Sequence, residues 1–101
     1  MTQITASGFD WDTGNREKCQ KHGLAVEEIE AFFQQEALDL APDLAHSQTE
    51  QRLLAIGRGP SGKPMMVVFV LRTQEGDTVI RPISARYMHE REAKKYERAN
   101  F

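Results

Sequence analysis

The sequence predicts an α+β fold, in which helices pack on a small antiparallel sheet. Two segments of the first half, at about residues 13–22 and 26–34, have the residue spacing of helices, whereas three short β-branched runs follow after Pro42. Helices that precede a group of strands, instead of alternating with them, are typical of this class. A chain of 101 residues can bury one ordinary core, so we expect a single domain over residues 1–101.

The N-terminal stretch predicts a short strand and a first helix. Aromatic and acidic residues alternate in FDWD (9–12), which ends a strand that also includes Ile4. Asp12 is a suitable N-cap for the helix over residues 13–22, and Gly23 is placed to end that helix.

The second predicted helix, over residues 26–34, has a clearer apolar stripe. Ile29 and Phe33 lie on one face at helical spacing, and we expect them in the core. Two glutamates in the first turn suit the positive end of the helix dipole, whereas Ala25 is a poor residue at the cap position.

Three short apolar runs predict an antiparallel meander. They span residues 52–58, 65–72 and 78–86, and the loops between them, GPSGKP and TQEGD, are rich in turn-forming residues. The middle run is apolar throughout, so it should be the central strand with both faces covered. Pro82 cannot donate a hydrogen bond to a sheet, so its strand is an edge there or has a bulge. The last segment, about residues 88–99, has the pattern of a C-terminal helix.

Composition favours a reducing compartment and argues against a membrane protein. The only cysteine, Cys19, cannot form an internal disulfide. The first ten residues lack the basic start and apolar run of a secretory signal, and the longest apolar run, Met65–Leu71, is too short to span a bilayer. We therefore expect a cytoplasmic protein without a membrane partner.

The charge of the chain is unevenly distributed. Residues 1–51 carry three Lys or Arg against ten Asp or Glu, a net charge of −7, whereas residues 52–101 carry ten against five, a net charge of +5. Such asymmetry is typical of a surface that faces a polyanion, but the two halves can also pair with each other within one fold. Charge alone does not decide between these interpretations.

The side chains available for chemistry exclude two common kinds of site. No two of the three histidines have the spacing of metal ligands, HEREAKKY departs from the HExxH motif at Ala93, and GRGPSGK lacks the spacing of a phosphate loop. We therefore expect no metal and no cofactor. Arginine with histidine, glutamate and tyrosine can cleave RNA without metal: a base takes the 2′-hydroxyl proton, cations stabilise the phosphorane, and an acid protonates the leaving oxygen. The same residue types also occur on many inert surfaces.

Several short motifs together resemble one protein family. In chain order they are FDWD (9–12), Asn15, KHG (21–23), EE (27–28), DLAH (43–46), Arg52, Gly57, an apolar strand, ISAR (83–86), Glu92 and Tyr96. In order and spacing they resemble the BrnT-type toxins of bacterial type II toxin–antitoxin systems, over about residues 9–97. The resemblance implies a RelE-like fold and a metal-independent endoribonuclease that inhibits translation. It also implies a BrnA-like ribbon-helix-helix antitoxin, with DNA contacted only through the toxin–antitoxin complex that represses the operon.

The resemblance also implies a set of site residues. The positions matched to catalytic residues are His22, Arg81, Arg86, Glu92 and Tyr96, and those matched to RNA-binding residues are Lys21, His46 and Arg52. Arg86 is the strongest candidate, because an arginine fork binds two phosphate oxygens at once and this one leaves a strand toward a helix start, where anions bind. Plainer roles remain open: His22 can be a charge at a helix end, and Glu92 with Tyr96 can be a helix-surface pair. Arg52 can be a charge at a hairpin end.

Some residues depart from the family pattern and keep other functions open. The sequence pI is near 5.9, whereas members of the family are commonly basic. Ala25 stands in place of a capping serine, Pro82 in place of an apolar strand residue, and Tyr87 begins a stretch where many members have further arginines. The alternative function is therefore a catalytically silent partner-binding module in an operon-repressor complex. Direct nucleic-acid binding without chemistry ranks last, because no helix-turn-helix pattern is present.

Overall fold

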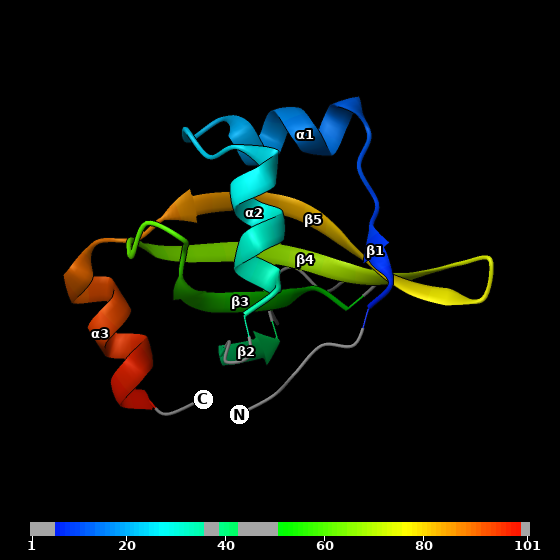
Figure 1. Cartoon of the computed structure of the whole chain (residues 1–101). Helices are drawn as coiled ribbons and strands as arrows, with labels where there is room; N and C mark the ends of the chain where they lie inside the picture. Colours follow the sequence, from blue (N-terminus) through cyan, green and yellow to red (C-terminus); the bar gives the residue numbers. More distant parts are fainter. Residues whose placement is uncertain (1–5, 36–38, 43–50, 100–101) are drawn as a thin grey trace.

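The computed structural model describes residues 6–35, 39–42 and 51–99 and shows an α+β fold with three helices and a five-stranded mixed sheet (Figure 1). The elements in chain order are β1 (Gly8–Phe9), α1 (Thr13–Gln20), α2 (Val26–Phe33), β2 (Asp39–Pro42), β3 (Leu53–Arg58), β4 (Pro64–Gln74), β5 (Asp77–Tyr87) and α3 (Glu90–Ala99). The predicted fold class is therefore confirmed, and the helices and the three long strands lie where the sequence placed them.

The sheet differs from the prediction at both of its edges. Its strand order is β1-β5-β4-β3-β2, so the predicted antiparallel meander β3-β4-β5 forms the centre. β2 adds an antiparallel edge that the sequence analysis missed, because DLAP is four residues long, ends in proline and has little β propensity. β1 pairs parallel with β5, which makes the sheet mixed instead of purely antiparallel. A parallel pair between residues about seventy positions apart has no local sequence pattern.

The two longest strands are joined by a tight turn and carry the predicted bulge. Glu75 and Gly76 both have positive φ angles, 52° and 85°, as a two-residue type I′ hairpin turn requires. Further along, Phe69 pairs with Pro82 but Val68 pairs with Ser84, so one extra residue stands in β5. The bulge accommodates the proline that cannot donate to the ladder, as the sequence predicted.

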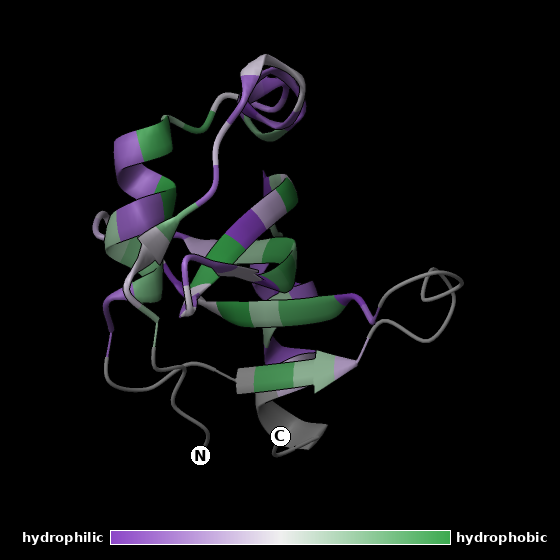
Figure 2. Cartoon of the chain, turned by 90° about the vertical axis from the view of Figure 1, so that its right-hand side faces the viewer, coloured by the Kyte–Doolittle hydropathy of each residue, from purple (hydrophilic) through white to green (hydrophobic). Residues whose placement is uncertain are grey.

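Two apolar clusters cover opposite faces of the sheet. The main core joins α1 and α2 to one face, where the rings of Phe33 on α2 and Phe69 on β4 lie 5.0 Å apart in an edge-to-face arrangement. Figure 2 shows α2 beside the sheet, banded in hydrophobic and hydrophilic residues. On the other face a smaller cluster packs Met88 and Ala93 of the α3 region against Ile56 and Met66. β4 is thus the central strand with both faces covered, as predicted.

The two N-terminal helices begin in different ways. The side chain of Asp12 accepts a hydrogen bond from the backbone of Asn15, and the Asn15 side chain accepts one from the backbone of Asp12, which forms a complete capping box for α1. α2 has Ala25 at its cap position and no side-chain cap hydrogen bond, as expected. The described part of the chain contains no helix long and apolar enough to cross a membrane.

Candidate functional site

The pairing register of β5 decides which way Arg86 points. Arg86 is opposite Met66 on β4, and Ser84 is opposite Val68, so these side chains share one face of the sheet. Met66 belongs to the apolar cluster beneath α3, whereas Ala85 belongs to the main core on the other face. Arg86 therefore lies on the side of the sheet that α3 covers.

Arg86 is held by Glu92, a residue of the first turn of α3. Its Nη1 donates to Glu92 Oε1 at 2.9 Å and its Nη2 donates to Glu92 Oε2 at 2.6 Å, so the pair is bidentate. Hydrogen bonds from Arg86 lower the pKa of the Glu92 carboxyl, and the same contact raises the pKa of Arg86. Glu92 is thus held in its ionised form. Both side chains remain accessible, with 42% and 30% of their areas exposed.

His22 and Arg86 line the same small hollow, although 64 positions separate them in the chain. The hollow has a volume of about 60 Å³, and its lining residues are His22, Met66, Val68, Ser84, Ala85 and Arg86. β1 pairs with Val79 and Ile80 of β5, so within the described residues no strand lies beside the C-terminal half of β5 on that side. The connection between α1 and α2, which contains His22, lies there instead (Figure 1). The structure therefore brings a histidine, an arginine and a serine hydroxyl together.

The other predicted site residues are placed differently. Tyr96 packs partly buried against the apolar cluster beneath α3, close enough to Arg86 to contribute to its raised pKa. Lys21 is exposed beside His22, and Arg52 lies half-buried just before β3. His46 falls outside the described residues.

Arg81 on β5 forms ion pairs with the segment that precedes α1. Its Nη2 donates to Asp12 Oδ2 at 2.8 Å, and its Nη1 lies 3.4 Å from Asp10 Oδ2. The pKa of Asp12 is lowered, first by the hydrogen bond from the Asn15 backbone and then by Arg81. Arg81 does not line the hollow that contains Arg86. The predicted catalytic role of Arg81 thus competes with a structural role.

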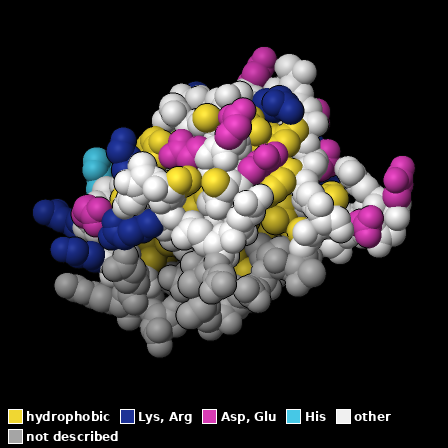
Figure 3. Space-filling view, viewed as in Figure 1, with side chains coloured by type: hydrophobic (Ala, Val, Ile, Leu, Met, Phe, Trp, Pro, Cys, Tyr) yellow, Lys and Arg dark blue, Asp and Glu magenta, His cyan; other side chains and the backbone are white. Residues whose placement is uncertain are grey.

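The uneven charge of the sequence has two outcomes in the structure. Arg81 pairs with acids of the first half, as one of the two interpretations proposed. Many cations of the second half nevertheless gather at the α3 end of the molecule, while acidic side chains lie over α2 and at the β4–β5 hairpin (Figure 3). Pairing between the two halves is therefore seen at Arg81, and a surface that faces a polyanion stays a prediction for the α3 end.

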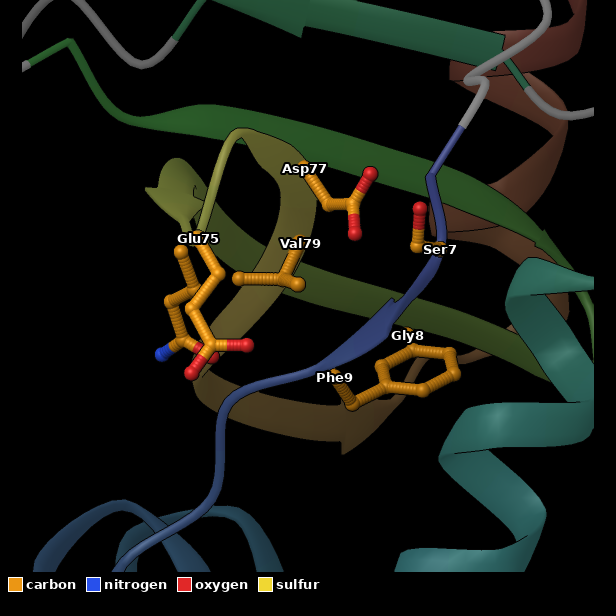
Figure 4. A pocket seen from close by; sticks show the side chains of 7 residues that line it. Ser7, Gly8, Phe9, Glu75, Asp77 and Val79 are labelled. Carbon is orange, nitrogen blue, oxygen red and sulfur yellow. The ribbon is translucent and has the colours of Figure 1, made fainter.

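A larger hollow lies at the opposite end of the sheet and has the wrong charge for a nucleic acid. It measures about 570 Å³ and lies between β1 and the β4–β5 hairpin, where Glu75 and Asp77 line it together with Ser7 and Phe9 (Figure 4). Two carboxylates repel a phosphate, so size alone does not make this hollow the site.

Two other kinds of chemistry find no support in the described residues. No group of three His, Cys, Asp or Glu in ranges 6–35, 39–42 and 51–99 is arranged to hold a metal ion. Cys19 is fully buried in the main core, and burial raises the pKa of its thiol to about 11. A thiol with so high a pKa is almost wholly protonated at neutral pH and is a poor nucleophile.

Ser84 and His89 were not among the predicted site residues, whereas Arg91 and Lys95 belong to the cluster of cations in the C-terminal segment where the sequence predicts that a phosphate docks. Ser84 belongs to the ISAR motif, and the β-strand alternation from Arg86 would have placed it on the same face. Arg91 and Lys95 are separated by four positions, which puts them on one face of a helix. The helical spacing of Arg91 and Lys95 could be read from the sequence. The hollow that they line with His89 and Glu92 depends on how α3 packs against the sheet.

The fold and the site define a small α+β protein with an arginine-centred surface suited to an anion. Residues 11–92 match the model of a protein family described as the ribonuclease toxin, BrnT, of type II toxin-antitoxin systems. This match covers most of the chain, so the chain belongs to the BrnT family and is the toxin of a type II toxin–antitoxin system. Membership implies an antitoxin partner. No curated protein matched the chain.

Proposed function

We propose that this toxin is a metal-independent endoribonuclease that inhibits translation and acts at the hollow shared by His22 and Arg86. The observation that carries the proposal is the convergence of these two residues, which the fold brings together from distant parts of the chain. We further propose a RelE-like single domain, a cytoplasmic location and neutralisation by a BrnA-like ribbon-helix-helix antitoxin. DNA would then be contacted only through the toxin–antitoxin complex.

The reaction needs no group beyond the side chains of the hollow and the RNA. The 2′-oxygen attacks the neighbouring phosphorus, the bond from phosphorus to the 5′-oxygen breaks, and a 2′,3′-cyclic phosphate and a 5′-hydroxyl result. Imidazole is the side chain best suited to move protons near neutral pH, so His22 is assigned both proton movements: it takes the proton of the 2′-hydroxyl and returns it to the leaving 5′-oxygen. Arg86 is assigned the stabilisation of the extra negative charge on the phosphorane, because Glu92 holds its guanidinium in place before the substrate arrives.

Glu92 and Arg81 receive supporting roles in this proposal. Both carboxylate oxygens of Glu92 accept hydrogen bonds from Arg86, so Glu92 is a positioning residue that holds the guanidinium in place. Arg81 fastens the N-terminal segment to β5 through Asp10 and Asp12. Tyr96, Lys21, His46 and Arg52 stay predictions as contacts to the RNA.

The test compares Arg86→Lys and Arg86→Ala in single-turnover RNA cleavage in excess EDTA, with identification of the product ends. Lysine keeps the charge but loses the planar fork, so both variants should lose about a hundred- to thousand-fold in rate. Arg58→Lys is a matched control: Arg58 on β3 binds Glu90 of α3 with the same bidentate geometry, at 2.9 Å for both contacts, but does not line the hollow.

Three results would count against the proposal. One is cleavage that stops in EDTA and returns with magnesium. Another is near-parental cleavage by Arg86→Lys, which would mean that Arg86 only attracts RNA by its charge and does not stabilise the phosphorane. The third is a natural chain that binds its antitoxin but leaves RNA intact, which would favour the catalytically silent partner-binding module.

A further inference from the structure

The first turn of α3 is anchored to the sheet by its acids. Glu90 accepts two hydrogen bonds from Arg58 of β3, and Glu92 accepts two from Arg86 of β5. Each acid is therefore neutralised by a strand arginine. The lysines of the helix interact with these acids only through their charges, as Lys95 does with Glu92, and Arg91 and Lys95 remain exposed.

A hollow of about 400 Å³ lies against this helix. Its lining residues are His89, Arg91, Glu92 and Lys95. Arg91 and Lys95 are exposed, and neither forms an ion pair or a side-chain hydrogen bond with any described residue. Glu92, the only acid among the described residues of this lining, is already bound to Arg86. The charge left over in the hollow is therefore positive, in the region where Figure 3 shows cations gathered.

The Arg86–Glu92 ion pair links this outer hollow to the proposed cleavage site. Glu92 lines the outer hollow, and its carboxylate holds the Arg86 guanidinium that lines the small hollow with His22. One ion pair therefore separates two places where an anion is favoured. A ligand with regularly spaced negative charges fits such an arrangement better than a single ion does.

We infer that the outer hollow is a second phosphate subsite, which binds a phosphate of the RNA strand next to the one that is cleaved. Arg91 and Lys95 supply the charge. The described residues of the lining include no aromatic ring on which a base could stack, so the subsite recognises the backbone and is tolerant of base identity. The inference rests on the proposed function for the position of the cleaved phosphate.

The test uses uncleavable 2′-deoxy oligonucleotides that contain one or two internal phosphates, titrated into the full chain and followed by NMR. The second phosphate should strengthen binding roughly five- to tenfold at 50 mM salt, because each neutralised phosphate of a single strand contributes a slope of about 0.7 in log K against log salt. Lys95→Gln should abolish most of this gain and reduce the salt slope by about 0.7.

Lys94→Gln is the matched control. Lys94 is the adjacent residue of the same helix, is exposed, and makes the same change in charge, but it does not line the hollow. Its variant should keep the gain from the second phosphate. Equal behaviour of the two variants would overturn the subsite, and so would a Lys95→Gln defect confined to antitoxin binding, since the hollow would then serve the protein partner.

The outcomes separate this inference from the proposed function. If the chain cleaves RNA and Lys95→Gln leaves both the cleavage rate and the gain from the second phosphate unchanged, the ribonuclease is supported and the subsite is refuted. A gain from the second phosphate that depends on Lys95, in a chain that cuts no RNA, would support the subsite and refute the ribonuclease.

Discussion

Replacement of Glu92 by glutamine tests whether this residue positions Arg86 or transfers a proton. Glutamine is nearly isosteric and can still accept one hydrogen bond from Arg86, but it removes a negative charge beside the site where the phosphate binds. A guanidinium has five N–H groups; two donate to Glu92, and Nη2 also contacts Met66 Sδ at 3.6 Å. N–H groups that do not donate to Glu92 remain for a phosphate, so a bound phosphate and the Glu92 carboxylate lie on the same guanidinium and repel each other.

The size of the effect follows from Coulomb's law. Two anions bound to one guanidinium lie roughly 6 Å apart, and their repulsion is about 0.7 kcal/mol in bulk water and about 2.8 kcal/mol at an effective dielectric constant of 20. Arg86 is 42% exposed and Glu92 30% exposed, which places the value near the lower limit. We expect Glu92→Gln to bind RNA about three- to tenfold more tightly, with a smaller gain at high salt.

The same variant should cost little stability, and the loss should depend on pH. A partly exposed ion pair contributes up to about 1 kcal/mol, so the melting temperature should fall by at most about 4–8 °C at neutral pH. The pKa of Glu92 is lowered from its ordinary value of 4.5 in the folded state, mainly by the hydrogen bonds from Arg86. The stabilisation is therefore fully present above pH 4.5 and is lost as the pH falls through the lowered pKa.

The assay measures RNA affinity, single-turnover rate and melting temperature against pH for Glu92→Gln and for Glu90→Gln. Glu90 is the matched control, because it accepts the same bidentate pair from Arg58 but lies away from the hollow that contains Arg86. A rate loss of a hundredfold or more, with unchanged affinity and a missing limb in the pH–rate profile, would refute the positioning role and make Glu92 a proton-transfer group.

Two further predictions concern the scaffold and are checked by chemical denaturation with circular dichroism. Asn15 is buried, and its Nδ2 donates to the carbonyl oxygens of Asp10 and Pro82. Asn15→Ala should therefore lower the free energy of unfolding by about 2–4 kcal/mol. A loss below about 1 kcal/mol would show that water replaces these contacts. Ala25→Ser should stabilise the fold by about 1 kcal/mol, because it supplies the missing N-cap of α2, whereas Ala25→Gly should stabilise it less. An unchanged denaturation midpoint in the serine variant would mean that its hydroxyl does not reach the free N–H groups of the first turn.

The local features of the fold were predictable because they depend on residues close in the chain. Asp12 caps α1, Pro82 coincides with the bulge, and the TQEGD loop forms the hairpin turn. Each is set by a property of one or two residues: a side-chain acceptor, a missing N–H group, or tolerance of positive φ. The sheet edges were predictable only in part: a short N-terminal strand was expected near Phe9, but neither its parallel pairing with β5 nor the whole of β2 was. β1 is two residues long and β2 four, and both are stabilised by strands distant in sequence.

For the candidate site, too, the local features could be predicted from the sequence and the long-range contacts could not. The sequence by itself determined the residue types, the family pattern and the direction of Arg86 relative to its strand neighbours, because β-strand alternation is local. Only the tertiary structure decided that His22 shares a hollow with Arg86 and that Arg81 is held by Asp10 and Asp12. These outcomes depend on how a helical connection and a two-residue strand pack beside β5. Such contacts join parts of the chain far apart in sequence, and a local pattern carries no information about them.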